Sequence, residues 1–345
     1  MIPGARVARR RARLRTVPGI VAAGVGAVVV LVATTWLLIV VRRALPDDAL
    51  GQSRSPTAPA FAERDVRDTA QAGVLIPDTL LGRSQALRFA ALTASEALEM
   101  PGIARSLGDS AGPGPATLAL DLGSASFTVF VVRPFAHKRG EMLGPYRLGW
   151  WPAERWMMAA NYLNPDGFVE VQRGADSTRL SSHFSMRDFL MQDQEDTWPK
   201  YVVLEERLLD KLELILRELG ERGVAANRAV VLSGFRAPYY NDRRVDEGAV
   251  RSSRHQFGDA ADVIIDADGD GRMDDLNGDR RHDLRDIAVI GSAVSAVERE
   301  YPELSGGLGS YAAQGPSGPF AHIDVRGTSA RWERARSARG DSSAR

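Results

Sequence analysis

The alternation of apolar and polar residues predicts a mixed domain in the second half of the chain. Between Tyr201 and Gly220, apolar residues recur every three to four positions, which is the spacing of one face of an amphipathic helix. A second helical pattern runs from Leu284 to about Glu300, and the short apolar runs Ala229–Leu232 and Ala260–Ile265 are typical of buried strands. Helices and antiparallel strands in this order predict an α+β fold over residues 176–332, with helices on a small antiparallel sheet.

The region before this domain has a different pattern. Residues 80–107 contain good helix formers and predict a helix. Thr117–Leu122 and Ser126–Val132 are short β-type runs that the Gly123-Ser124 turn joins as a hairpin. We therefore expect a helix plus a small, mostly β module over residues 80–175. Its tryptophans either pack in a core or stack on sugar rings.

An apolar stretch near the N-terminus predicts a membrane anchor. Residues 20–41 carry no charge and, at about 1.5 Å per residue, are long enough to cross a hydrocarbon core of roughly 30 Å. Six arginines precede this stretch within residues 1–19, whereas only Arg42 and Arg43 follow it closely. The asymmetry predicts a cytoplasmic basic segment, one transmembrane helix, and a remainder outside the cytoplasm, on the periplasmic or extracellular face.

Two further segments lack apolar periodicity. Residues 42–79 are rich in Pro, Ala, Ser, Asp and Arg and predict a linker that leaves the membrane. Residues 333–345 are rich in Arg, Ser and Ala and predict a disordered tail. With 345 residues, the chain has room for about two domains plus the anchor.

Composition excludes some classes of partner and site. Lys+Arg and Asp+Glu both number 44, so the chain lacks the net basic field that a nucleic-acid partner requires. Cysteine is absent, which excludes disulfides and any cysteine-ligated metal site.

The chemistry concentrates in two histidine–aspartate pairs. His255 and Asp262 lie in the pattern S-x-H-x-x-G-x-A-x-D, and His322 and Asp324 follow downstream. Nitrogen and oxygen ligands of this kind suit a zinc ion that keeps one position open for water. Asp262 begins an apolar run, where a carboxylate needs a positive partner. Zinc would supply that charge, and the alternative partner is Arg236, in a structural ion pair.

Two further segments support a family resemblance. Ser233–Asn241 reads SGFRAPYYN, and Gly306–Tyr311 reads GGLGSY. Together with the S-x-H-x-x-G-x-A-x-D pattern, and in the same order, they resemble the zinc D-Ala-D-Ala carboxypeptidases of the VanY type. That family shares its fold with the murein endopeptidases and the hedgehog signalling domain. The resemblance covers roughly residues 178–332.

The resemblance implies a membrane-anchored zinc metallopeptidase that hydrolyses peptide bonds in peptidoglycan stem peptides, as a carboxypeptidase or an endopeptidase. It implies zinc ligation by His255, Asp262 and His322. Arg236 would face the substrate and stabilise the developing oxyanion. The alternatives are a zinc-containing binding or scaffolding module that does not cleave, and a peptidase for protein substrates.

The remaining expectations for the site concern substrate binding and the roles of His322 and Asp324. Ser253 and Asn241 are expected to contribute to substrate binding, with Asn241 orienting the same loop. Many relatives carry a glutamate shortly before the last histidine, whereas this chain has Pro319, Phe320 and Ala321 there. We expect His322 to bind zinc and Asp324 to assist catalysis, and the reverse assignment stays open. Because residues two apart on a strand face the same side, both can reach one site.

An acidic insert at residues 266–286 predicts a second metal site. Calcium-binding loops use residues 1, 3, 5, 7, 9 and 12 as ligands, with glycine at position 6. Gly271 takes position 6, and the ligand positions are matched by Asp266, Asp268, Asp270, Arg272 through its carbonyl, Asp274 and Asn277. Asn277 replaces the usual glutamate, so the affinity should be lower. The alternative is a solvated acidic loop with interspersed arginines.

Overall fold

The structure is a computed structural model that describes residues 89–99, 113–119, 126–245, 249–313 and 315–334. The predicted basic segment, transmembrane helix and linker lie outside these residues, as does the predicted tail from residue 335 onward. The first two residues of that tail, 333 and 334, were wrongly predicted as disordered and belong to a strand. Within the described ranges, no helix is both long enough and apolar enough to cross a membrane.

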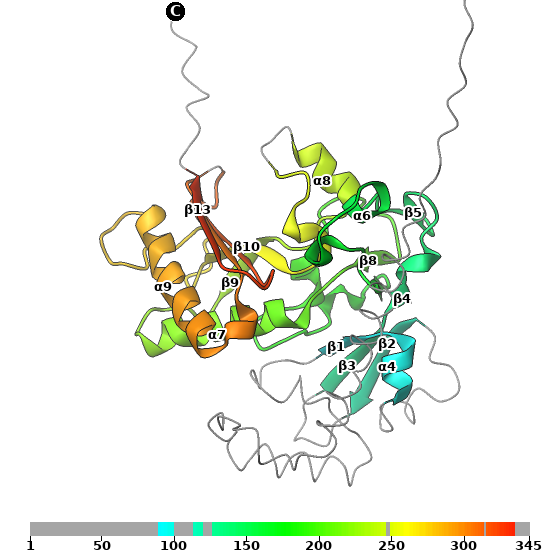
Figure 1. The fold of residues 1–345 in the computed structure, drawn as a ribbon. Helices are drawn as coiled ribbons and strands as arrows, with labels where there is room; N and C mark the ends of the chain where they lie inside the picture. Colours follow the sequence, from blue (N-terminus) through cyan, green and yellow to red (C-terminus); the bar gives the residue numbers. More distant parts are fainter. Residues whose placement is uncertain (1–88, 100–112, 120–125, 246–248, 314, 335–345) are drawn as a thin grey trace, which may run out of the picture. The chain divides into compact units, whose positions relative to one another are not determined.

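The described part contains α-helices and several small groups of strands (Figure 1). In chain order they are β1 (Phe89–Leu92), α4 (Ala94–Glu99), β2 (Gly114–Ala119), β3 (Ser126–Val131), β4 (Arg133–Pro134), β5 (Met142–Leu143), β6 (Tyr146–Arg147), α6 (Pro152–Arg155), β7 (Gly167–Val171), β8 (Lys200–Val202), α7 (Glu206–Glu221), β9 (Ala229–Ser233), α8 (Pro238–Arg244), β10 (Ala260–Ile265), α9 (Leu284–Glu300), β11 (Gly307–Tyr311), β12 (Phe320–Asp324) and β13 (Ala330–Arg334).

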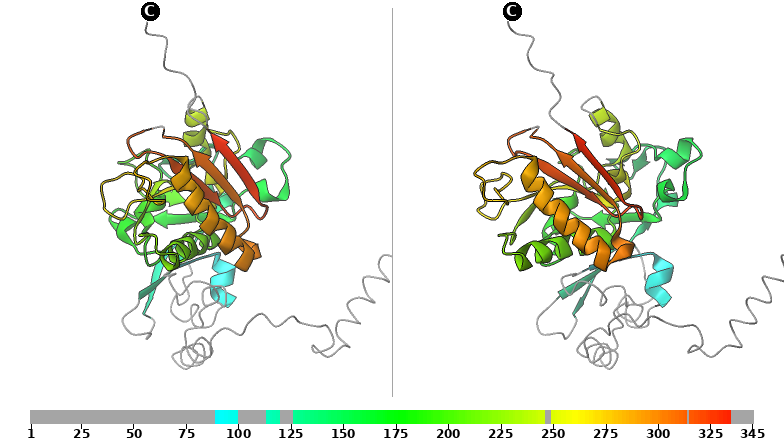
Figure 2. Two further views of the ribbon diagram at one scale, coloured as in Figure 1. Left: turned by 90° about the vertical axis from the view of Figure 1, so that its left-hand side faces the viewer. Right: turned by 60° about the vertical axis from the view of Figure 1, so that its left-hand side comes forward.

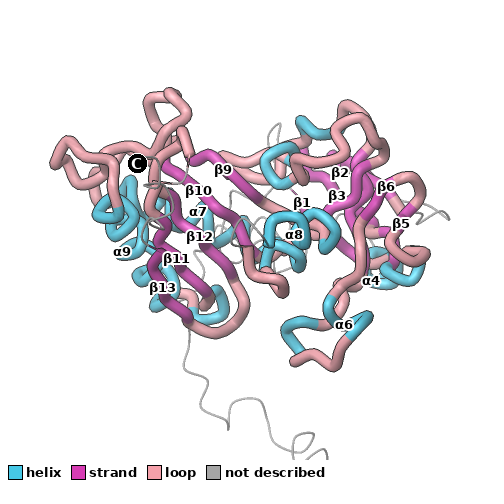
Figure 3. The backbone as a smooth tube through the Cα atoms, turned by 90° about the horizontal axis from the view of Figure 1, so that it is seen from above, coloured by secondary structure: helices cyan, strands magenta, loops and turns pink. Residues whose placement is uncertain are grey.

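A five-stranded sheet in the order β13-β11-β12-β10-β9 is the framework of the C-terminal part (Figure 3). The long helices α7 and α9 pack against each other, and α9 also contacts β11 and β12 (Figure 2). On β12, Ala321 and Ile323 are fully buried, while His322 and Asp324 point to the opposite face. One face of the sheet therefore belongs to the hydrophobic core, and the other carries the polar residues.

The predicted elements of this part are largely confirmed. The helical patterns become α7 and α9, and the two apolar runs become the antiparallel neighbours β9 and β10. β10 and β11 each pair with β12 in antiparallel fashion. The last strand, β13, was not predicted, and it pairs in parallel with β11.

The N-terminal module differs from its prediction at one place. Phe89–Leu92, expected in a helix, is the strand β1, which pairs in parallel with β3. Phe89 is fully buried and packs edge-on against Phe130, so burial beside β3 outweighs the helical propensity of the local sequence. The predicted antiparallel pairing is confirmed for β2 and β3, and the predicted turn between them lies outside the described residues.

The two predicted modules share a sheet and a hydrophobic core. β7 precedes the expected boundary near residue 175, and its antiparallel partner β8 follows it. One hydrophobic core includes residues from both sides, among them Trp151, which is fully buried and stacks on Phe235. Trp151 is therefore a core residue, whereas Trp150 and Trp156 are 37% and 53% exposed.

Candidate metal centre

Three side chains that are distant in sequence meet on the polar face of the sheet. His255 Nε2 lies 3.1 Å from His322 Nδ1 and 3.2 Å from Asp262 Oδ1. The third separation, between His322 Nδ1 and Asp262 Oδ1, is 2.9 Å. All three residues are buried. The structure thus brings together the three residues predicted to bind zinc.

Local structure explains how each donor arrives there. His255 lies in a 3-10 turn, Arg254–Phe257, that ends at Gly258 with φ of +69°. A Cβ on Gly258 would collide with the backbone of Val203, so this position needs glycine for its conformation and for the close approach. Asp262 and His322 are opposite each other on β10 and β12. The turn then folds over this pair and adds His255.

The outer nitrogens of both imidazoles already have acceptors. His255 Nδ1 lies 2.7 Å from the carbonyl oxygen of Gly234, and His322 Nε2 lies 3.2 Å from Asp324 Oδ2. A neutral imidazole has one N–H and one lone pair, so donation outward leaves both inner nitrogens as acceptors. Two lone pairs and the Asp262 carboxylate therefore face one another in a buried place, and only a cation or an added proton relieves that arrangement.

The donor set and its spacing fit zinc. Donors held at about 2.0–2.1 Å from one tetrahedral ion lie roughly 3.3 Å apart, close to the separations seen here. Two imidazoles and one carboxylate are also a usual catalytic zinc set. Burial, together with the charge of Arg236, lowers the pKa of His255 to about 4, which keeps this ligand neutral at neutral pH.

Two carboxylates surround His322. Burial by itself would lower the pKa of this imidazole, but its hydrogen bonds with Asp262 and Asp324 outweigh burial and raise the pKa. The surroundings therefore favour a positive charge here, and a metal ion between the three donors would provide one.

Arg236 pairs with Asp262, as the alternative for that residue suggested. Its Nη2 contacts Asp262 Oδ2, and its Nε donates to Ser233 Oγ at 2.6 Å. Burial alone would raise the pKa of Asp262, but the neighbouring His255 and Arg236 hold it well below its usual range. The other carboxylate oxygen, Oδ1, faces the two histidines, so the ion pair and metal ligation are compatible.

Asp324 lies on the outer side of His322 and is fully buried. Its carboxylate accepts hydrogen bonds from Arg326 and from the Gly307 N–H at 2.7 Å. Burial would raise the pKa of Asp324, but the hydrogen bonds with His322 and Arg326 outweigh it and keep the pKa well below its usual range. This geometry suits a carboxylate that orients a metal-binding imidazole.

Asn241 and Ser253, which were predicted to bind substrate together with Arg236, are not part of this donor cluster. Asn241 is fully buried, and its Nδ2 donates to the carbonyl oxygens of Val250 and Arg251 at 3.0 and 3.1 Å. It therefore holds the loop before the His255 turn, which is the orienting role, and its burial does not favour direct contact with substrate. Ser253 immediately precedes that turn and is 9% exposed.

The acidic insert also forms a carboxylate group. Ligand atoms of Asp266, Asp268 and Asp274 lie within 4.8 Å of one another, and Asp266 is fully buried. Asp266 also contacts Arg228 at 3.1 Å and accepts the N–H of Gly269 and of Gly271. Asp270 is outside this group and accepts the Arg272 N–H at 2.8 Å, while the Asn277 N–H lies 3.4 Å from Asp286 Oδ1. Only part of the predicted loop thus converges.

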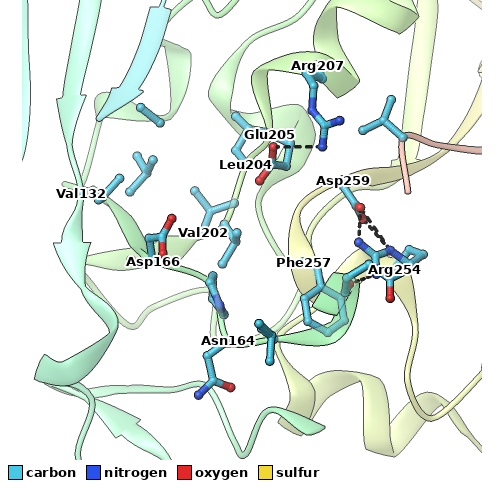
Figure 4. A pocket seen from close by; sticks show the side chains of 18 of the residues that line it. Val132, Asn164, Asp166, Val202, Leu204, Glu205, Arg207, Arg254, Phe257 and Asp259 are labelled. Atoms are coloured by element: carbon cyan, nitrogen blue, oxygen red, sulfur yellow. Dashed lines mark hydrogen bonds and ion pairs between the residues drawn. The ribbon is translucent and has the colours of Figure 1, made fainter. Parts of the chain in front are cut away.

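A cavity of about 360 Å³ lies elsewhere in the described part of the chain (Figure 4). Its lining includes Asp166, Glu205, Phe257 and the buried ion pair of Arg254 with Asp259. None of the three clustered donors lines it. The pair braces the turn that carries His255, because Arg254 is the first residue of that turn and Asp259 follows it.

One solved structure is similar to part of the chain. It is the L-Ala D-Glu endopeptidase ChiX of Serratia marcescens, with 20% sequence identity and a TM-score of 0.24, over 36% of this chain and 82% of that one. No protein-family model matches the chain. No curated protein matches it either.

Residues that support the cluster were missed by sequence reasoning. In the sequence Trp332 marks only the end of the predicted domain, yet its ring centroid lies 5.3 Å from that of His322. Arg326 was not singled out, although it holds Asp324. The available signal was the glycine-rich strand at 306–311, since small residues on a strand often mark the close approach of another group.

We expect His322 and Asp324 to differ in their effect on bound zinc. His322→Ala should lose the ion because one of three ligands is removed, whereas Asp324→Asn should retain it with about 10- to 100-fold weaker affinity. Metal content and chelator competition on the purified variants measure both. Zinc retained in His322→Ala but lost in Asp324→Asn would show the reverse assignment.

Proposed function

We propose that this chain is a zinc-dependent peptidase that acts on peptidoglycan stem peptides. The observation that carries the proposal is the buried convergence of His255 Nε2, His322 Nδ1 and Asp262 Oδ1, three acceptors within 3.2 Å of one another. The S-x-H-x-x-G-x-A-x-D pattern and its neighbouring segments, which resemble the VanY-type peptidases, support the substrate class.

Each side chain of such a zinc site would have a distinct role. When bound, zinc supplies an activated water and polarises the scissile carbonyl. His255 and His322 present neutral imidazole nitrogens, and Asp262 contributes the single negative charge. Gly234 O and Asp324 hold the two rings from outside, which fixes their tautomers.

Arg236 is the candidate for substrate contact. Its Nε and Nη2 contact Ser233 and Asp262, whereas a guanidinium carries five N–H donors. The side chain is 12% exposed and adjoins Asp262. We propose that a remaining donor binds the developing oxyanion while the ion pair holds the guanidinium in place. Asp324, enclosed behind His322, would assist by orienting that ring and not by taking a proton from water.

A substitution at His255 tests both metal binding and cleavage. His255→Ala should lose zinc and reduce muropeptide cleavage by at least a hundredfold, because an emptied site has no activated water. Zinc content by atomic absorption and cleavage by chromatography measure these effects. His137→Ala is the matched control, since His137 is exposed.

Other results would choose between the alternatives. Full zinc occupancy and unchanged cleavage in His255→Ala would overturn the assignment. Zinc binding to the wild-type chain without cleavage of any muropeptide would favour the binding or scaffolding module. Cleavage of proteins but not muropeptides would favour a protein peptidase.

We also propose that residues 20–41 anchor the chain in the membrane, with the rest outside the cytoplasm. The arginine excess before this stretch supports that orientation. An alkaline phosphatase fused to the C-terminus should therefore be active in cells. An inactive phosphatase, together with an active cytoplasmic reporter at the same position, would reverse the topology.

Calcium is proposed as a second, stabilising ion. The grouping of Asp266, Asp268 and Asp274 supports it, and the departure of Asp270 and Asn277 from the pattern predicts weak affinity. An ion that binds only the folded state raises stability as its concentration exceeds the dissociation constant.

Millimolar calcium should therefore raise the Tm of the wild-type chain by a few degrees. The free energy of unfolding rises by about 1–2 kcal/mol when the calcium concentration is ten to thirty times the dissociation constant. The double variant Asp268→Ala with Asp274→Ala should show no shift in thermal scans. The exposed pair Glu195→Ala with Asp196→Ala is the matched control and should keep the shift. A wild-type chain that does not respond to calcium would support the solvated loop instead.

A further inference from the structure

Trp332 lies beside His322, on the same face of the sheet. Asp262, His322, Gly309 and Trp332 form one row across β10, β12, β11 and β13. The ring centroids of Trp332 and His322 are 5.3 Å apart, at an interplanar angle of 48°. Gly309 stands between these two residues in the row, so the rings meet across a position that has no side chain.

The glycine at position 309 is what permits this contact. A Cβ built on Gly309 would lie 2.5 Å from both Cε2 and Nε1 of Trp332, closer than real Cβ contacts come. Gly309 does not have a positive φ angle, so its backbone conformation is open to other residues. The glycine therefore makes room for the indole and does not serve an unusual turn.

Trp332 is also held in place by its neighbours. Its Nε1 donates to the Tyr311 hydroxyl at 3.0 Å, and the Tyr311 ring stacks on Phe320 with centroids 4.7 Å apart. The Arg326 guanidinium lies over the indole, 5.3 Å from the ring centroid. Arg326 also binds Asp324. It therefore contacts both Trp332 and Asp324, the two residues that lie against His322.

We propose that Trp332 is a positioning residue for His322. The indole limits rotation of the imidazole from one side, while Asp324 holds Nε2. Together these contacts keep Nδ1 directed at His255 and Asp262. The inference rests on the proposed zinc site, but its test does not depend on peptide cleavage.

Zinc affinity of the full-length chain, measured by competition with a chromophoric chelator, is the readout. Trp332→Ala should bind zinc at least about tenfold more weakly, the usual cost of losing a group that orients a metal ligand. Trp332→Phe keeps an aromatic ring on Gly309 and should recover most of the affinity. Trp156→Ala removes a half-exposed tryptophan elsewhere and should leave zinc affinity unchanged. Circular dichroism establishes that each variant is folded.

Gly309→Ala distinguishes positioning from general destabilisation. The added methyl group would displace the indole, so zinc affinity should fall about as far as in Trp332→Ala. In the Trp332→Ala background the same methyl group has room, and it should cause little further loss. Gly307→Ala is the contrast: its Cβ would meet Asp324 as well as Trp332, so it should weaken zinc binding in both backgrounds.

Unchanged zinc affinity in folded Trp332→Ala, or losses that simply add in the double variant, would overturn the proposal. Trp332→Leu takes the place of Trp332→Ala in the same comparison if the latter does not fold. A wild-type chain that binds zinc but cleaves no muropeptide would refute the peptidase proposal and leave this one standing. A wild-type chain that binds no zinc would refute both.

Discussion

Three hydrogen-bond acceptors facing one another in a buried place are the constraint on which this site depends. When His255 and His322 donate outward, as metal ligation through the inner nitrogens requires, these nitrogens and Asp262 Oδ1 face one another as acceptors. Such an arrangement is unfavourable in a low-dielectric setting unless a positive charge compensates it. A cation at this point would therefore bind the turn before β10 to the centre of the sheet.

The surroundings of the cluster keep the three donors in one geometry. Arg236 neutralises the outer oxygen of Asp262, and the carbonyl oxygen of Gly234 fixes the His255 ring. Asp324 does the same for His322 and is itself held by Arg326 and the Gly307 N–H. Each donor thus has an outward partner, which leaves the inward side for a ligand.

The glycine-rich strand β11 connects this polar network to the sheet. Side chains at Gly306 and Gly307 would collide with Asp324, and a side chain at Gly309 would collide with Trp332. Because these positions have no side chains, the carboxylate of Asp324 and the indole of Trp332 can lie directly on the backbone of the strand. The other face contributes packing, because α9 contacts β12, on which Ala321 and Ile323 are fully buried, and α7 packs against α9.

Sequence alone determined the elements with a clear period and the residues with a distinctive spacing. β10 has the bounds predicted from its apolar run, and α9 begins at the predicted Leu284. The resemblance carried by the histidine–aspartate motifs implied His255, Asp262 and His322 as one ligand set, and these three side chains lie together. Local pattern suffices there, because apolar periodicity reports burial and few residue types ligate metals.

Tertiary structure decided what depends on partners distant in sequence. β1 is a strand because β3 lies beside it, although its own residues favour a helix. Asp324 faces the outer nitrogen of His322 and not the inner one because of the side-chain geometry on β12. Trp332 reaches His322 only because β13 pairs in parallel with β11 and places it opposite Gly309. No local pattern encodes a strand register, since the register results from packing the whole sheet.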